Sequence, residues 1–153
     1  MSEPPVRSFL RAADGYRWDE VARLQYRQDA GAPFRDVTRQ VLFGRADMQA
    51  ELRYFEVAAG GHSTLERHVH AHAVMVLRGA GEVLVGDGVH AIRSFDLVSV
   101  PTLTWHQFRA GSREALGFLC MVDAARDKPQ LPDAQALARL RCDPRVAAFM
   151  DRN

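Results

Sequence analysis

Short hydrophobic runs separated by turns fill the middle of the chain, and several of them alternate hydrophobic with polar residues. That alternation is the period of a β-strand with one buried face. The clearest turn is Gly86-Asp87-Gly88, which predicts a hairpin between the runs on either side. The predicted strands cover residues 34–43, 51–57, 82–85, 89–92, 96–100, 104–108 and 116–122. Short strands at this regular spacing favour an antiparallel sheet that forms a barrel or a sandwich.

The N-terminal part lacks this regularity. Residues 1–15 carry prolines and a glycine and predict a loosely attached arm. Residues 16–26 fit either a short helix or an irregular packing segment, and the pattern does not separate the two. A turn is expected over residues 29–33.

The C-terminal part changes to helical spacing. Hydrophobic residues recur every three or four positions over residues 133–141, and Asp143-Pro144 predicts the start of a second short helix that ends near Met150. We expect these helices to cover a barrel edge or a subunit contact. The domain organisation is then an N-terminal arm, a barrel and a helical tail, over residues 1–33, 34–125 and 126–153.

Four side chains that can bind a metal ion stand at alternate positions within residues 66–72. They are Glu66, His68, His70 and His72. Alternate residues of a strand point to the same face, so an extended segment would place all four on one surface. A helix would distribute them around its circumference. The spacing therefore predicts a strand with a row of possible metal ligands.

Composition narrows the class of protein. A chain of 153 residues is most simply one domain, and its net charge of +1 gives no electrostatic reason to expect nucleic acid or a membrane surface as a partner. We find no hydrophobic run near the roughly 20 residues needed to cross a bilayer, and no signal-peptide core. Two cysteines do not form a disulfide framework. We therefore expect a cytoplasmic protein with reduced thiols.

The segment that starts at Gly60 resembles the first motif of the cupin superfamily, whose members are small β-barrels that hold a metal inside. That motif runs glycine, five residues, His-x-His, a glutamate, and a closing glycine pair. Without gaps, Leu77 to Gly81 supplies the closing Leu-x-Gly-x-Gly, while Glu66, His68 and His72 fall on three ligand positions. The resemblance implies the double-stranded β-helix, or jelly-roll, fold.

A second cupin motif follows at the expected distance. It reads glycine, five residues, proline, any residue, glycine, two residues, histidine, three residues, asparagine. Pro101 and His106 match it, whereas Phe95, Leu103 and Ala110 stand at its glycine and asparagine positions. The resemblance therefore adds His106 as a ligand from a separate strand.

The implied ligand set is Glu66, His68, His72 and His106. Imidazole and carboxylate donors suit manganese, iron(II), nickel, cobalt or zinc. In a competing register His68 and His70 form the His-x-His pair, but Val74 would then occupy the glutamate position. We prefer the first register because all four positions are filled, and it places His70 near the metal but outside its ligands.

Plainer interpretations exist for several of these residues. The histidines could form a surface row that binds metal only adventitiously, and Glu66 could pair with Arg67 or Arg53. Isolated histidines such as His62 and His90 are ordinary polar residues by default.

Cys120 and the arginines raise separate questions. Cys120 is either a small buried hydrophobic residue or a thiol that faces the barrel interior near the metal. Cys142, between the predicted helices, is expected to be inert. Candidates for holding an anionic substrate are Arg78, Arg93 and Arg109.

The resemblance implies a metal-dependent enzyme for a small polar metabolite, such as a phosphorylated sugar, with the metal as a Lewis acid in lyase or isomerase chemistry. More narrowly, the chain resembles single-domain cupins that release methanethiol from methylthio-xylulose phosphate with manganese. His70 or Cys120 would then move protons or contact sulfur. The alternatives are an iron-dependent dioxygenase and a non-enzymatic sugar-binding or sensing module. By resemblance we also expect a homodimer that pairs through edge strands.

Overall fold

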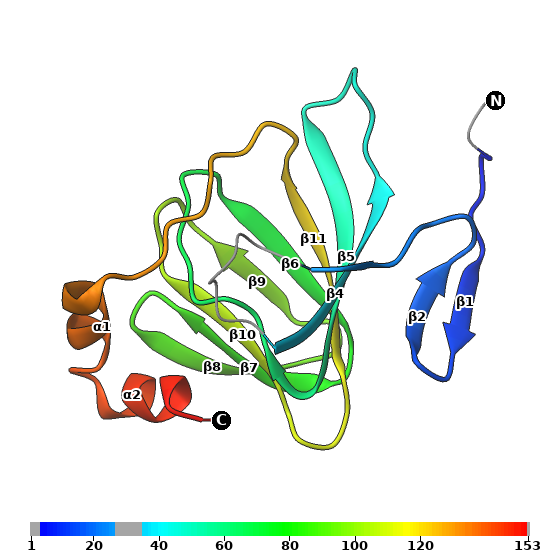
Figure 1. Ribbon diagram of the computed structural model, residues 1–153. Coiled ribbons are helices and arrows are strands. Elements are labelled where there is room, and N and C mark those ends of the chain that lie inside the picture. Colours follow the sequence, from blue (N-terminus) through cyan, green and yellow to red (C-terminus); the bar gives the residue numbers. More distant parts are fainter. Residues whose placement is uncertain (1–3, 27–34, 153) are drawn as a thin grey trace.

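An antiparallel sheet that curls into a half-barrel dominates the computed structural model, which describes residues 4–26 and 35–152 (Figure 1). The prediction of an all-β, jelly-roll barrel with short C-terminal helices is confirmed. The strands are β1 (Phe9–Ala12), β2 (Gly15–Trp18), β3 (Leu24–Gln25), β4 (Arg35–Phe43), β5 (Ala50–His62), β6 (His72–Arg78), β7 (Ala80–Val85), β8 (Gly88–Arg93), β9 (Leu97–Val100), β10 (His106–Ala110) and β11 (Leu116–Asp123). The helices are α1 (Ala134–Leu140) and α2 (Pro144–Met150).

The strands of the main sheet follow the order β8-β7-β10-β5-β11-β6-β9, with β4 added beside β5 and β3 beside β4. The seven runs predicted as strands appear as β4, β5 and β7 to β11, with their ends shifted by a few residues. Gly86 and Asp87 form the predicted hairpin turn, since Val85 pairs with Gly88. The turn predicted over residues 29–33 lies outside the described residues.

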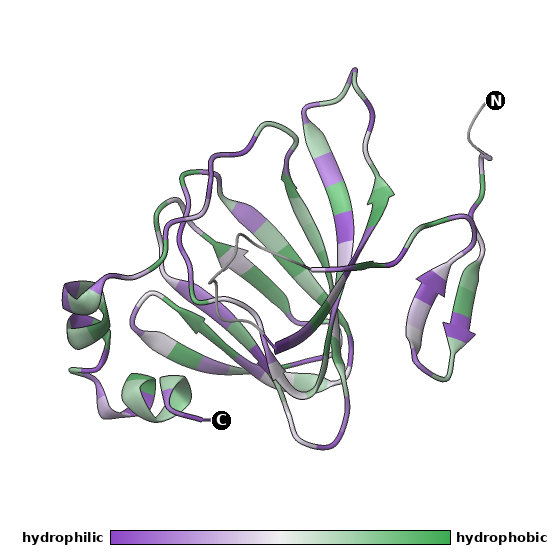
Figure 2. Ribbon diagram, viewed as in Figure 1, coloured by the Kyte–Doolittle hydropathy of each residue, from purple (hydrophilic) through white to green (hydrophobic). Residues whose placement is uncertain are grey.

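Hydrophobic and polar residues alternate along the strands, as bands in Figure 2 show. The side chains that point inward form one core between the curled walls of the sheet. Its most buried members are Val57, Val74, Val76, Val83, Leu116 and their neighbours on adjacent strands. Burying this apolar surface is the main force that keeps the sheet curled.

The glycines of the Leu-x-Gly-x-Gly segment have separate backbone roles at the β6–β7 turn. Gly79 has a φ of +73°, in the left-handed region. A Cβ on Gly81 would lie 2.1 Å from the carbonyl oxygen of Arg109 on the neighbouring strand. Neither position accepts a side chain without a shift of the backbone, so these glycines allow β7 to lie close against β10.

Within residues 4–26 there is no helix, and this segment packs against the barrel instead of forming a loose arm. Strands β1 and β2 form a hairpin at one side of the barrel (Figure 1). The ring of Tyr16 stacks on Tyr54, and Trp18 meets the same ring edge to face at 5.0 Å. Tyr54 points outward from β5 yet is fully buried, because this hairpin covers it.

Helix α2 packs on the outer face of β7 and β8 at the edge of the sheet, which agrees with the barrel-edge prediction, and α1 lies beside it (Figure 1). Val146 and Phe149 of α2 pack with Leu65 and Leu84 in a second small core. Asp143 caps the N-terminus of α2 by accepting a hydrogen bond from the backbone N–H of Arg145. No helix among residues 4–26 and 35–152 is long and apolar enough to cross a membrane.

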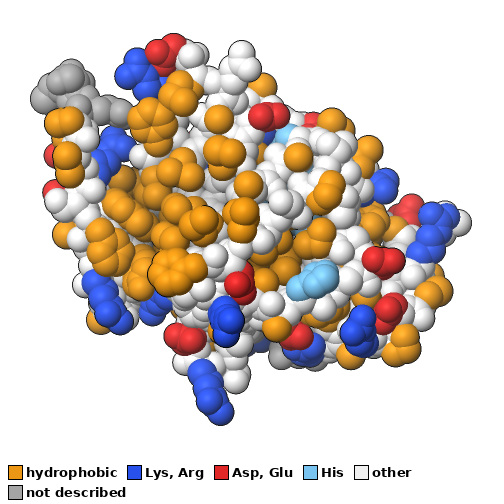
Figure 3. Space-filling view, turned by 180° about the vertical axis from the view of Figure 1, so that it is seen from behind, with side chains coloured by type: hydrophobic (Ala, Val, Ile, Leu, Met, Phe, Trp, Pro, Cys, Tyr) orange, Lys and Arg blue, Asp and Glu red, His pale blue; other side chains and the backbone are white. Residues whose placement is uncertain are grey.

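The outer face of β11, β6 and β9 carries exposed hydrophobic side chains. We call Met75, Leu97 and Met121 the outer hydrophobic face, and they are 40%, 65% and 56% exposed. Met75 pairs directly with Leu97 on the adjacent strand. Hydrophobic side chains cover a broad area of the molecule seen from behind in Figure 3. A patch of this kind is typical of a protein contact surface.

Candidate metal centre

The segment predicted as one strand through residues 66–72 is not a strand, and that part of the prediction is wrong. Strand β5 ends at His62, β6 begins at His72, and Glu66 makes only an isolated bridge with His106. The segment bends because β10 holds it. The backbones of Glu66 and His106 exchange two hydrogen bonds, and Leu103 N–H donates to the carbonyl of His68.

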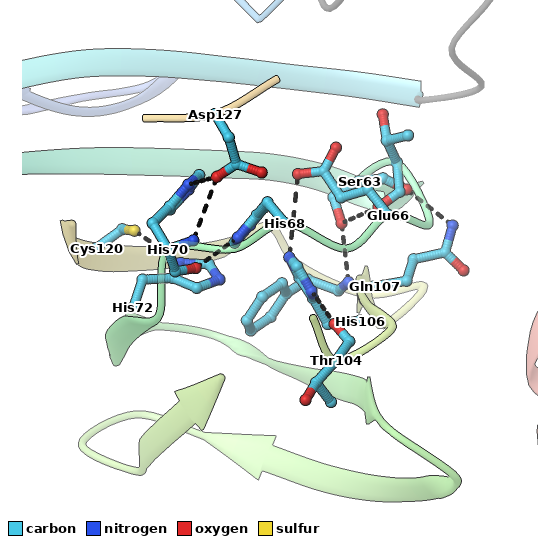
Figure 4. A network of polar contacts seen from close by, with 12 residues as sticks. Ser63, Glu66, His68, His70, His72, Thr104, His106, Gln107, Cys120 and Asp127 are labelled. Carbon is cyan, nitrogen blue, oxygen red and sulfur yellow. Dashed lines mark hydrogen bonds and ion pairs between the residues drawn. The ribbon is translucent and has the colours of Figure 1, made fainter. Parts of the chain in front are cut away.

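This bent segment still brings three of the predicted ligands together. Each of His68, His72 and His106 offers a ring nitrogen, and the three nitrogens lie within 4.8 Å of one another. The ring centroids are 4.8 to 5.1 Å apart in every pair. Figure 4 shows the rings converging from the bent segment and from β10. Residues far apart in the sequence therefore share one site.

Hydrogen bonds fix which nitrogen of each ring faces that site. The Nδ1–H of His68 donates to the carbonyl of His70 at 2.6 Å, and that of His106 donates to the carbonyl of Thr104 at 2.9 Å. The Nδ1 of His72 lies 3.1 Å from Cys120 Sγ. With each Nδ1 engaged, Nε2 keeps a free lone pair, which is the arrangement that a metal-binding imidazole needs.

The rings are also held in their neutral form. Burial, with a smaller contribution from the neighbouring imidazoles, lowers the pKa of His72 to about 2 and that of His106 to about 4. Burial likewise lowers the pKa of His68. Only a neutral imidazole can donate an electron pair to a metal, so the site is ready to bind a cation at neutral pH.

Glu66 lies at the edge of the same cluster. Its Oε1 is 3.9 Å from the Nε2 of His106, the nitrogen that faces the site (Figure 4). The plainer partners of Glu66 are engaged elsewhere: Arg67 donates to Gln130, and Arg53 lies near Glu51. Among the described residues, the group of possible metal ligands consists of the three histidines, and the Glu66 carboxylate lies next to it.

The residues fit a divalent metal ion. The Nε2 of His72 is buried and has no hydrogen-bond partner among the described residues. A buried polar atom without a partner is costly, and a cation between the three imidazoles would supply one. Nitrogen and carboxylate donors match the borderline divalent ions expected from the sequence.

His70 stands beside the cluster rather than in it. Its ring stacks on His68 with centroids 3.7 Å apart, and its Nδ1 is 2.8 Å from Asp127 Oδ1. Asp127 also accepts the backbone N–H groups of Val69 and His70. The Val69 N–H bond is the main reason that the pKa of Asp127 is lowered. His62 and His90 lie outside the cluster, and Val74 is part of the core.

Cys120 belongs to the hydrophobic core and also faces the interior beside the histidine cluster, so it has features of both interpretations. Its side chain is 1% exposed and lies between His72 and the Nη2 of Arg53, at 3.1 Å and 3.6 Å from Sγ. Burial raises the pKa of the thiol, and the Arg53 guanidinium opposes that rise. Cys142 is exposed and, like Cys120, forms no disulfide.

A cavity of about 230 Å³ connects these groups. It is smaller than the roughly 300–1,000 Å³ typical of drug-sized ligands and so suits a small metabolite. Its wall includes Arg39, Arg53 and Arg126, which the sequence did not single out because they belong to no motif.

The three arginines chosen from the sequence do not line the cavity, so that prediction is wrong. Arg78 pairs with Glu56 over the Tyr16 ring. Arg93 is exposed on β8. Arg109 donates to the carbonyls of Met150 and Arg152 at the end of α2. Arg78 and Arg109 are therefore engaged outside the barrel interior.

The curled sheet with possible metal ligands on separate segments is typical of a cupin, and the chain belongs to the cupin family. The model of the cupin domain matches residues 53–122. The chain is 58% identical to 1-methylthio-D-xylulose 5-phosphate methylsulfurylase of Rhodospirillum rubrum over 145 residues, which cover 95% of this chain and 93% of that protein.

Solved structures show the same relationship. A cupin 2 conserved barrel domain protein from Rhodopseudomonas palustris is 55% identical, with a TM-score of 0.85 and coverage of 93% of this chain and 97% of that chain. A cupin-2 domain protein from Rhodospirillum rubrum is 57% identical, with a TM-score of 0.85 and coverage of 97% and 98%. The family resemblance found in the two motifs is therefore confirmed.

Proposed function

We propose that this protein is a metal-dependent cupin enzyme that removes the methylthio group from 1-methylthio-D-xylulose 5-phosphate. The observation that carries the proposal is the contact of Cys120 Sγ with His72 Nδ1 inside the cavity, which sets a thiol against the candidate metal centre. The name of the 58% identical relative supports the substrate.

His68, His72, His106 and Glu66 would hold the ion, and we expect manganese from the family resemblance. When bound, such an ion supplies Lewis-acid stabilisation of negative charge on a substrate carbonyl oxygen. The remaining chemistry falls to the side chains of the cavity.

Cys120 is the candidate acceptor of the methylthio group. Attack of its thiolate on the substrate sulfur forms a disulfide between Sγ and the methylthio sulfur and breaks the bond from that sulfur to C1. The electron pair of the broken bond remains on the sugar as an enolate. A proton added at C1 then gives the 1-deoxy ketose phosphate.

His70 is the candidate donor of that proton. Its ring lines the cavity, and Asp127 holds its Nδ1, so the orientation of the ring is fixed. A small thiol from solution then exchanges with the Cys120 disulfide and carries away the methylthio group. A second thiol would convert that product to methanethiol and a disulfide, so methanethiol release consumes two thiols.

Turnover without oxygen is the direct test. The purified protein is incubated with manganese, the methylthio sugar phosphate and a small thiol under nitrogen, and the products are followed by nuclear magnetic resonance. We expect the 1-deoxy ketose phosphate in an amount equal to the methylthio disulfide and methanethiol together. Turnover only in air would indicate the dioxygenase alternative, and binding without turnover would indicate the sugar-binding module; either result would contradict the proposal.

A homodimer is part of the proposal, and we expect it to form through the outer hydrophobic face. This face includes the edge strand β9, which agrees with pairing through edge strands. In a two-fold dimer the same patch meets its own copy. A patch made of Met75, Leu97 and Met121 can do so without placing like charges together. The cytoplasmic location stays a prediction.

A further inference from the structure

The charges that line the cavity are divided between two sides. Arg39 lies on β4, Arg53 on β5 and Arg126 just after β11. These elements are neighbours, because β5 pairs with both β4 and β11. The histidine cluster and Glu66 come instead from the bent segment after β5, from the first residue of β6 and from β10. One wall is therefore cationic, and the metal centre occupies another.

Aromatic rings hold the guanidinium groups of this wall. Arg53 lies over the ring of Phe55 at 4.9 Å, and Arg39 lies over Tyr26 at 6.0 Å. Tyr26 and Phe55 themselves meet edge to face at 5.4 Å. Such stacking uses the flat faces of the arginines and leaves their N–H edges available.

Some N–H groups on these guanidinium edges lack hydrogen-bond partners. The Nε atoms of Arg39 and Arg53 are buried and have no hydrogen-bond partner within residues 4–26 and 35–152. The Arg53 side chain is only 10% exposed. A buried guanidinium without full pairing is unfavourable unless an anion arrives.

The carboxylates nearby do not neutralise the wall. Glu51 lies 3.7 Å from Arg53 Nε and 3.4 Å from Arg126 Nη1, so one carboxylate is shared by two arginines. Asp127, which lines the cavity, is occupied by His70 and two backbone N–H groups. The wall keeps an excess of positive charge.

We infer that Arg39, Arg53 and Arg126 form a subsite for the phosphate group of the substrate. Guanidinium groups bind phosphate with paired, charge-assisted hydrogen bonds. Phosphate at this wall fixes the sugar with its other end toward the histidine cluster. Cys120 lies between the two, in contact with both Arg53 and His72. This inference rests on the proposed function, which supplies the phosphorylated substrate.

Calorimetric binding of D-xylulose 5-phosphate to the manganese-loaded protein tests the subsite without turnover. The variants are Arg39→Gln and Arg126→Gln, since neither residue contacts Cys120. The matched control is Arg93→Gln, an exposed arginine outside the cavity. We expect each cavity variant to bind at least tenfold more weakly and the control to bind like the wild type. Arg39→Lys, which keeps the charge, should recover part of the loss.

D-xylulose without phosphate is the second probe. Its affinity should be equal in the wild type and the variants, because it has no group for the arginines to bind. Equal affinity of D-xylulose 5-phosphate for the wild type and both cavity variants, or no binding at all, would overturn the inference even if the methylthio sugar phosphate is turned over. Arginine-dependent binding without turnover would support the subsite and refute the proposed reaction instead.

Discussion

Each histidine of the cluster is oriented by a partner on its Nδ1: a backbone carbonyl for His68 and His106, and the Cys120 sulfur for His72. The contact of His72 with Cys120 differs from the other two, because it joins a candidate metal ligand to a thiol that can react. A metal-bound His72 and the Cys120 thiol would therefore influence each other directly. This pair is the residue-scale feature on which the proposed sulfur transfer depends.

Replacing Cys120 by serine should abolish sulfur transfer while leaving the metal bound. Serine keeps a hydroxyl near His72 but is a poor acceptor for a methylthio group, so we expect kcat to fall by at least about a hundredfold. The assay is the anaerobic turnover described above, and metal content is measured on the same sample. Cys142→Ser, which changes the exposed cysteine, should retain full activity. A Cys120→Ser enzyme as active as the wild type would exclude the thiol as acceptor.

The bent segment between β5 and β6 is the element on which the site depends. It is tied to β10 through Glu66 and to the segment after β11 through Asp127, which accepts N–H groups from Val69 and His70. These contacts come from parts of the chain distant in sequence. The positions of His68 and His72 are therefore set by tertiary contacts rather than by the segment itself.

Asp127→Ala should loosen this segment and weaken metal binding. The positioning partners of metal ligands typically change affinity by about tenfold to a hundredfold, and we expect a loss near tenfold here. Competition with a fluorescent chelator measures the affinity. Asp47→Ala removes an exposed carboxylate paired with Arg45 and serves as the control. Unchanged affinity in Asp127→Ala would show that Asp127 does not hold the segment.

The elements also show what the sequence could predict. The alternating strands, the Gly86-Asp87 hairpin and the capped helices are local features, and local patterns predicted them. The strand through residues 66–72 was predicted wrongly because backbone bonds to β10 outweigh the local alternation. The cationic wall could not be predicted, since Arg39, Arg53 and Arg126 meet only in the folded sheet.

At two positions of the second cupin motif, the backbone conformation matches the motif although the residue type does not. Phe95 and Leu103 stand where the motif has glycines, and sequence comparison alone counts them as mismatches. Their φ angles are +74° and +52°, so the backbone keeps the left-handed conformation that suits glycine. The backbone path, rather than the residue type, is what this chain shares with the motif at those two positions.

On the scale of the whole molecule, the curled sheet has two different surfaces. Its inner face carries the core and the cavity, and its outer face is covered by the β1–β2 hairpin at one place and by the helices at another. The outer hydrophobic face remains uncovered on β11, β6 and β9. A second copy of the chain would bury it without disturbing the cavity.

The double variant Met75→Glu with Leu97→Glu should convert the expected dimer to a monomer, because the two-fold contact would bring four carboxylates together. Sedimentation should give the wild type twice the chain mass of 17.1 kDa and the variant that mass once. Leu131→Glu, at an exposed position between β11 and α1, is the control. A wild type that sediments as a monomer would refute the dimer, and a variant that stays dimeric would refute this face.

The central claim is that three histidines and one glutamate hold a single divalent ion in the cavity. The most direct measurement is elemental analysis of protein stripped with a chelator, reloaded with manganese and freed of excess metal, alongside a His72→Ala, His106→Ala double variant. We predict about one ion per chain for the wild type and almost none for the variant, with circular dichroism confirming that both are folded. Metal-free wild type after reloading, or equal metal content in the folded variant, would contradict the account.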